Sequence, residues 1–309
     1  MELGQYQRRA QGTDRVPLTG DEARDREARL VPLLGLAGEV GTLLAGYKKF
    51  LRDGEAYELF TDNVGEEVGD LLWYLANVAD KWGLSLDELA AANLTKTTDR
   101  WPEPGARVPK RKPADFLDSL AARGERLPRT FTVDISSVGR DRDLEERIEV
   151  RYRGKAVGSR LGDNTYDASG YRFHDVFHLA NAAILGWSPV ARAQLFGCKR
   201  REQGIVNEVE DGGRAIVIEE GMAAFLFEHA RHHRWFEDVT SLDYDILKTI
   251  RVMTAGLEVR HRPLWEVERA VLQGFAVWRQ VRDANGGRIV GDLYRRSITF
   301  QSLPQRGGS

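Results

Sequence analysis

The stretch Gly65-Glu66-Glu67-Val68-Gly69-Asp70-Leu71-Leu72-Trp73-Tyr74-Leu75 decides how the first third of the chain is organised. Glu67 and Asp70 are three residues apart, and Glu66 and Asp70 are four apart, so a helix brings these carboxylates to one face. The leucines that follow supply an apolar stripe. Like charges this close weaken a helix unless a cation lies between them. The alternative interpretation is a solvated acidic helix end, since acids suit a first turn.

A second acidic helix lies upstream, where Glu39-Val40-Gly41-Thr42 stands among small and apolar residues. The order Glu39–Thr42, Glu67–Asp70 and then Asn93-Leu94-Thr95-Lys96 resembles the all-α MazG-like nucleoside triphosphate pyrophosphohydrolases. That family carries an E-x-x-E pair, an E-x-x-D pair and a closing helix with N-x-x-K. The resemblance covers roughly the first third of the chain. Thr42 departs from it, because the family has a second glutamate there.

The resemblance implies a hydrolase that cleaves nucleoside triphosphates, ribo or deoxy, to the monophosphate and pyrophosphate through water attack at the α-phosphorus. It implies Mg²⁺ as cofactor, with Mn²⁺ as a substitute, and a homo-oligomer of two or more chains. The residues that it assigns are Glu39, Glu67 and Asp70 as metal ligands, Glu66 as a helper that holds a water or acts as base, and Lys96, Asn93 and Trp73 as substrate contacts.

Other interpretations of these residues stay open. Trp73 is equally suited to packing in a core or interface, and Lys96 by itself is an ordinary solvated helix residue. Thr42 brings no negative charge, so the alternative function is a nucleotide-sensing or regulatory module with a weakened metal site. A panel of nucleotides incubated with magnesium distinguishes an enzyme from such a module.

Composition bounds the remaining classes. The 309 residues predict about two domains, and 42% hydrophobic with 30% charged residues is typical of a soluble globular protein. A formal net charge of −2 gives no reason to expect nonspecific nucleic-acid binding. The single cysteine, Cys198, excludes an intramolecular disulfide and fits a reducing compartment. We expect a cytoplasmic protein without a membrane span or signal peptide, because no run of eighteen apolar residues occurs.

The first part of the chain predicts an antiparallel helical bundle. Thr19 with Glu22 forms the pattern of a capping box, and Pro32 predicts a break in the helix that follows. Gly38 and Gly41 predict a close approach of another helix or a ligand. The predicted helices are 2–12, one from Thr19 that resumes at 33–50, 62–81, and 85–100. The predicted N-terminal MazG-like domain is 1–102, and a proline-rich, basic, solvated linker occupies 103–115.

The second domain, residues 116–303, is predicted to be α+β and mostly helical, so the chain as a whole is mainly α. Phe131, Val133 and Ile135 alternate with polar residues, as do Ile148, Val150 and Tyr152, which predicts two strands. Gly154 predicts a hairpin turn. A further strand is expected at 214–218, and helices at 171–185, 189–199, 219–234, 242–260 and 264–284.

All six histidines fall at or after position 174. His174 and His178 are four residues apart, a spacing that lets one helical face chelate a transition metal. Glu219 or Glu220 is the candidate third ligand, and Asp175 a candidate base. The alternative is a pair of structural histidines packed beside Asp175 and Glu220. Some MazG-like proteins carry an additional C-terminal domain of this general kind, and the resemblance assigns no activity to that domain.

Overall fold

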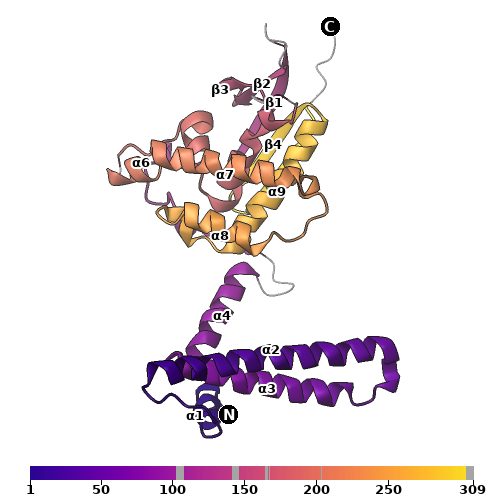
Figure 1. Ribbon diagram of the computed structural model, residues 1–309. Helices are drawn as coiled ribbons and strands as arrows, with labels where there is room; N and C mark the ends of the chain where they lie inside the picture. Colours follow the sequence, from indigo (N-terminus) through magenta and orange to yellow (C-terminus); the bar gives the residue numbers. More distant parts are fainter. Residues whose placement is uncertain (102–107, 141–145, 164–165, 167, 203, 304–309) are drawn as a thin grey trace. The chain divides into compact units, whose positions relative to one another are not determined.

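The computed structural model describes residues 1–101, 108–140, 146–163, 166, 168–202 and 204–303. The chain divides into two compact units, Met1–Thr98 and Asp99–Ser309, and each is described by itself (Figure 1).

The N-terminal unit is built on a helical hairpin. Its helices are α1 (Leu3–Gln11), α2 (Glu22–Asp53), α3 (Phe60–Lys81) and α4 (Leu86–Arg100), with a 3-10 turn, η1 (Gly54–Ala56), after α2. The long helices α2 and α3 run side by side in opposite directions (Figure 1). The predicted helices are therefore present, but their details differ at the start of α2.

Two local predictions for α2 were wrong. The cap is Asp21, whose carboxylate accepts a hydrogen bond from the Arg24 amide, while the Thr19 hydroxyl donates to Asp25. Pro32 does not break the helix, which is 32 residues long and contains this proline in its interior. Proline removes one backbone hydrogen bond at a cost of about 3 kcal/mol, and the remaining bonds of so long a helix carry it through.

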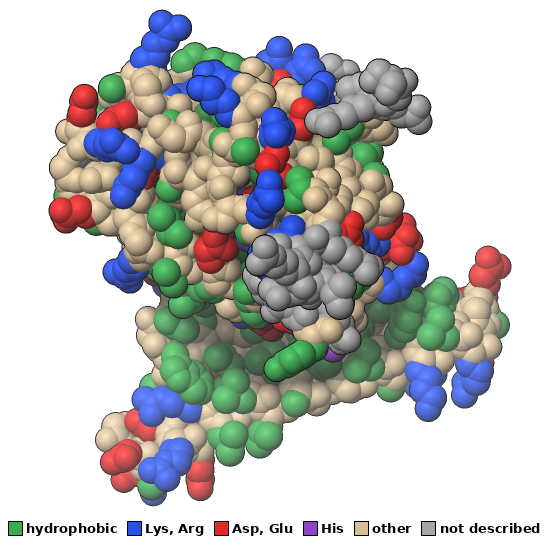
Figure 2. All heavy atoms as spheres, turned by 90° about the horizontal axis from the view of Figure 1, so that it is seen from above, with side chains coloured by type: hydrophobic (Ala, Val, Ile, Leu, Met, Phe, Trp, Pro, Cys, Tyr) green, Lys and Arg blue, Asp and Glu red, His purple; other side chains and the backbone are tan. Residues whose placement is uncertain are grey.

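The N-terminal unit buries little apolar surface of its own. Its fully buried hydrophobic side chains among the described residues are the alanines Ala10, Ala28, Ala76 and Ala79. Large apolar side chains instead lie exposed along α2 and α3, and Figure 2 shows hydrophobic side chains gathered along this long helical part. Those at least 44% exposed are Leu30, Val31, Leu34, Val40, Leu44, Tyr47, Leu51, Val68 and Leu75.

One described helix, Glu22–Ala56 with its 3-10 turn included, is long and apolar enough to cross a membrane. The prediction from uninterrupted apolar runs did not find it, since Glu39 and several glycines divide the segment. A single such helix is weak evidence for a span, because core helices of soluble proteins have the same length and composition.

The C-terminal unit contains one antiparallel sheet in the order β3-β2-β1-β4-β5. Val133 pairs with Tyr152 on one side and Ile289 on the other, so the predicted alternation places one apolar face inward. Gly154 turns the predicted hairpin at a φ of 76°. The strands are β1 (Thr130–Arg140), β2 (Glu146–Tyr152), β3 (Lys155–Leu161), β4 (Gly286–Asp292) and β5 (Ser297–Gln301).

Helices cover the inner face of this sheet. The long helix α9 lies along β4 (Figure 1) and also contacts β5 and the short helix α5. Its Phe275 and Trp278 are buried in the core. The helices are α5 (Asp175–Ala180), α6 (Ile205–Val209), α7 (Gly213–Arg231), α8 (Tyr244–Met253) and α9 (Leu264–Asp283). Shorter turns are η2 (Pro113–Asp115), η3 (Arg123–Glu125), η4 (Tyr171–Phe173), η7 (Arg234–Phe236), η8 (Glu258–His261) and two π turns, η5 (Asn181–Leu185) and η6 (Ala191–Phe196).

The strand predicted at 214–218 was wrong. These residues open α7, and the run Ile216-Val217-Ile218 is β-branched but not alternating in burial. Ala215, Glu219 and Met222 are buried while Val217 is 70% exposed, which is the helical spacing.

The basic linker prediction was also wrong at Arg111. The predicted linker lies partly outside the described residues, but Arg111 is 1% exposed, and its guanidinium pairs with Glu266 at 2.5 Å. Its amide donates to the Tyr294 carbonyl at 2.8 Å. Arg111 is therefore part of the C-terminal unit, because a buried cation needs a fixed anion.

Asp118 is a buried anion of the same kind. Its carboxylate lies 2.6 Å from Nη2 of both Arg192 and Arg129 and accepts the Leu127 amide at 2.7 Å. Burial opposes its ionisation, but the two guanidiniums and the amide outweigh burial and hold its pKa below the ordinary 3.8.

We predict that Asp118→Asn lowers the free energy of unfolding of the C-terminal unit by about 3–5 kcal/mol, because it removes the charge that pairs with buried Arg192 at 2.6 Å and leaves only the more distant Asp211 carboxylate at 3.8 Å. The native carboxylate's contribution is complete above its ordinary pKa and is lost as pH falls through the lowered pKa. Urea unfolding at pH 7 and pH 3 measures both effects. The control is Asp245→Asn, an exposed partner of Lys248, which should leave the midpoint unchanged. Equal midpoints for the Asp118 variant and wild type would contradict the assignment.

Candidate functional site

The structure brings Glu39 of α2 and Glu67 of α3 into contact. Burial raises the pKa of the Glu67 carboxyl, and the Glu39 carboxyl at hydrogen-bonding range raises it further, followed by Asp70 and Glu66. One oxygen of Glu67, Oε2, is inaccessible to solvent and has no hydrogen-bond partner. Such an oxygen is costly unless a proton or a cation satisfies it.

The carboxylates of the four predicted acids do not all converge on one position. Glu66 and Asp70 are exposed on α3 and act on Glu67 through their charge. In the part of the chain that the structure describes, no three of these acids bring ligand oxygens within 4.8 Å of one another. This spacing suits a cation that keeps several waters.

A cavity of about 230 Å³ adjoins these acids. Glu66, Glu67 and Thr42 line one part of it, and aromatic, amide, cationic and small or apolar residues line the rest. The motif analysis missed four lining residues with polar or aromatic side chains: Lys49, Tyr57, Phe60 and Asn63.

For two of the missed residues, Asn63 and Lys49, the helical spacing from the motif residues is a usable signal. Asn63 lies four residues before Glu67, and Lys49 lies seven after Thr42, so each repeats the face of a motif residue. Tyr57 comes from the α2–α3 connection, and Phe60, the first residue of α3, stacks on Phe50 with ring centroids 4.3 Å apart. Helical spacing alone does not predict how such a connection folds.

Thr42 faces the cavity but its hydroxyl is weakly engaged, donating to the Gly38 carbonyl of its own helix at 3.4 Å. Nothing described lies within 4 Å of a side chain built at Gly38 or Gly41, so the predicted close approach does not occur there within the chain. It occurs at Gly35, where a Cβ would meet the ring of Tyr74.

The predicted substrate contacts lie apart from this cavity. Asn93 and Lys96 are exposed on α4 and do not line it. Trp73 donates its indole N–H to the Thr13 hydroxyl at 2.8 Å and packs edge-on against Tyr74. The packing interpretation of Trp73 therefore accounts for its contacts.

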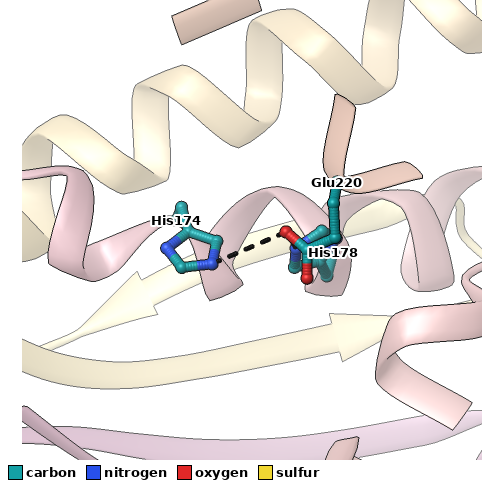
Figure 3. Close-up of side chains that lie close together, drawn as sticks. All are labelled: His174, His178 and Glu220. Atoms are coloured by element: carbon teal, nitrogen blue, oxygen red, sulfur yellow. Dashed lines mark ion pairs between the residues drawn. The ribbon is translucent and has the colours of Figure 1, made fainter. Parts of the chain in front are cut away.

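The C-terminal unit gathers His174, His178 and Glu220, with one ligand atom of each within 4.8 Å of the others (Figure 3). Nε2 of His178 lies 3.3 Å from Oε2 of Glu220, and Nε2 of His174 lies 3.8 Å from the same oxygen. His174 is the residue before α5, His178 lies within α5, and Glu220 comes from α7. Of the two sequence alternatives for a third ligand, Glu220 faces both imidazoles.

Glu219 lies behind His178 and not beside His174. Its Oε1 is 3.2 Å from Nδ1 of His178, and both side chains are fully buried. Glu219 also accepts hydrogen bonds from Asn181, Ser188 and the Val190 amide, each at 3.0 Å. It is a positioning residue that holds one side of the His178 ring.

Burial and charge act oppositely on the two histidines. Burial lowers the pKa of His174, although Asp175 and Glu220 oppose it. Burial also disfavours a charged His178, but Glu219 and Glu220 outweigh it and raise its pKa to about 10. Both ring nitrogens of His178 are buried, and neither has a hydrogen-bond partner among the described residues. Burial raises the pKa of the neighbouring Asp175 carboxyl.

Comparison with known proteins places the family match in the C-terminal part. The family model of the MazG C-terminal domain matches residues 112–304. The Gene 37 protein of Mycobacterium phage L5 is 32% identical over 102 residues, which is 32% of this chain and 89% of that protein. No solved structure matches. The match supports a MazG-like assignment but lies in the part that motif analysis left without an activity, not in the N-terminal third.

Proposed function

The chain belongs to the MazG C-terminal domain family, and on that premise we propose that its N-terminal unit hydrolyses nucleoside triphosphates to the monophosphate and pyrophosphate. The observation that carries the proposal is the buried, unpartnered Oε2 of Glu67, set among Glu39, Glu66 and Asp70 beside a cavity. We place the protein in the cytoplasm, with Mg²⁺ as cofactor and Mn²⁺ as a substitute.

The donor set fits magnesium. Carboxylate oxygens on adjacent helices are its preferred ligands, and the clustered charge that raises the pKa of Glu67 is what a divalent cation would relieve. Glu39, Glu67 and Asp70 would hold the ion, in part through its bound waters. When bound, magnesium would offset phosphate charge and make a water more acidic.

The remaining residues bind and orient the substrate. Glu66 lines the cavity and can accept the proton of a water that attacks the α-phosphorus, with pyrophosphate leaving. The Lys49 ammonium offers a charge to the phosphates, and the Tyr57 and Phe60 rings offer faces to a base. Lys96 and Asn93 are proposed to reach the substrate from α4.

We predict that Asp70→Asn reduces turnover at limiting magnesium by roughly 100-fold or more, because an oxygen-ligand site loses one charge. Monophosphate and pyrophosphate are measured across a panel of NTPs and dNTPs, with folding followed by circular dichroism. The matched control is Asp62→Asn, an exposed acid in the first turn of the same helix, which should retain activity. Wild-type turnover in the Asp70 variant would remove Asp70 from the site. A wild type inactive on every nucleotide would favour the sensing module.

Because Thr42 leaves the site with one carboxylate fewer, we predict that it holds one magnesium ion tightly and that any second ion arrives on the nucleotide phosphates. Thr42→Glu adds a carboxylate to the cavity wall and should tighten magnesium binding to the nucleotide-free protein. Calorimetry with magnesium or manganese, with and without a non-hydrolysable nucleotide, measures this. Two high-affinity ions in the nucleotide-free wild type would refute the idea and indicate that Glu66 supplies the missing ligand.

We propose that a second copy of the chain covers the apolar surface of α2 and α3, giving a dimer or larger homo-oligomer. The unit's own described core is four alanines, so its exposed leucines have little else to pack against.

Leu44→Glu, at a side chain 63% exposed on α2, should shift the protein towards monomer because it places a charge in the interface. Light scattering at micromolar concentration without detergent measures the mass. The control is Leu120→Glu, 93% exposed in the C-terminal unit, which should not change it. A monomeric wild type, or one that stays in solution only with detergent or vesicles, would overturn the proposal.

A further inference from the structure

We propose that His174, His178 and Glu220 form a binding site for one transition-metal ion of the Zn²⁺ class, separate from the carboxylate site of the N-terminal unit. The two imidazoles, from α5 and the residue before it, and the carboxylate, from α7, converge on one point (Figure 3). Three side chains with nitrogen and oxygen donors are the protein share of a four-coordinate zinc site.

Both imidazoles present the same ring nitrogen to this point. Nδ1 of His174 lies 2.9 Å from the Tyr171 carbonyl, so it carries the proton and leaves the lone pair on Nε2. Nδ1 of His178 faces Glu219 at 3.2 Å and its Nε2 faces Glu220 at 3.3 Å, so a metal ion on the Glu220 side would take the place of a proton on Nε2. Ligating histidines in metal sites are held in this manner, by a backbone carbonyl or a carboxylate on the far nitrogen.

The ring of His174 is also fixed in place. It stacks on Tyr171 with centroids 4.5 Å apart and planes inclined by 11°. Together with the Tyr171 carbonyl, this contact sets the direction of Nε2 before any ligand arrives. A buried pair of structural histidines has no need of two rings aimed at one carboxylate oxygen.

The distances are close to those of a bound ion. Zinc–ligand bonds near 2.0–2.1 Å place tetrahedral ligand atoms about 3.3 Å apart. The separations from Oε2 of Glu220 are 3.3 Å to His178 and 3.8 Å to His174, and the three ligand atoms lie within 4.8 Å of one another, so side-chain rotations would be needed to complete the geometry. The Nε2 atom of His178 is buried without a hydrogen bond, and metal coordination would satisfy it.

The donor types select the metal, and the exposure sets the remaining ligand. Imidazole favours zinc and its neighbours in the first transition row over magnesium, which prefers oxygen. The Glu220 side chain is 35% exposed, while those of His174 and His178 are 12% and 0%. The fourth position therefore lies towards solvent on the Glu220 side and would take a water.

The test is zinc binding to the full chain, stripped with chelator and then held in excess magnesium so that oxygen-ligand sites are saturated. We expect calorimetry to show one zinc per chain, and cobalt to give the visible absorption of a tetrahedral site. Zinc should also raise the thermal unfolding temperature, since an ion that binds only the folded state stabilises it.

Two variants and two controls distinguish this site from incidental binding. Glu220→Gln and His174→Gln keep the side-chain volume at partly exposed positions and should each weaken zinc binding roughly 100-fold or more, since even an outer-shell partner is worth 10–100-fold. His232→Gln and Glu208→Gln change exposed residues of the same types and should leave binding unchanged.

The outcomes are decisive in both directions. A wild type that takes up no zinc, or whose melting temperature zinc does not raise, would establish the alternative of a buried ion pair around His178. Zinc binding that survives both variants would place the ion elsewhere. Neither result bears on nucleotide hydrolysis, which is assayed with magnesium and depends on Asp70, so failure here is distinguishable from failure of the proposed function.

Discussion

The hydrogen bonds accepted by the buried carboxylate of Glu219 are the interaction around which the candidate site of the C-terminal unit is built. A carboxylate removed from water must be met by donors, and Glu219 receives them from Asn181, Ser188 and the Val190 amide. These contacts fix α7 against the end of α5 and the chain that follows it. They also fix the direction in which the next residue, Glu220, points from α7. The Glu219 carboxylate, which cannot reach both histidines, therefore positions the Glu220 carboxylate, which faces both.

The two units differ in how much apolar and charged side-chain surface they bury internally. The C-terminal unit buries its large side chains internally and neutralises its buried arginines, including Arg111 and Arg192, with fixed carboxylates. The N-terminal unit buries alanines and leaves leucines on its surface. Hydrophobic association is the largest favourable term in folding and assembly, so the free energy that the first unit gains alone is small, and a partner surface of the same composition would complete it.

The two candidate sites differ in donor chemistry as well as in fold. The site on α2 and α3 offers carboxylate oxygens, spaced widely enough for a hydrated cation beside a cavity. The site on α5 and α7 offers imidazole nitrogens with one carboxylate, in close convergence. The proposed magnesium site and the proposed transition-metal site would therefore not compete for the same ions, because one offers hard oxygen ligands and the other mainly imidazole nitrogens.

The sequence by itself determined the helical hairpin of the N-terminal unit, the strands at Phe131–Ile135 and Ile148–Tyr152, and the pairing of His174 with His178, since each depends on spacing of 2 or 3.6 residues within one element. Tertiary structure decided the rest. β4 escaped prediction because three of its seven residues are glycines, and packing against neighbouring strands explains two of them: a side chain at Gly287 would collide with the Phe300 ring of β5, and one at Gly291 with the Phe131 ring of β1. Packing likewise chose Glu220 over Glu219, turned Ile216–Ile218 into helix and buried Arg111. Each of these outcomes depends on a partner distant in sequence, which local spacing does not encode.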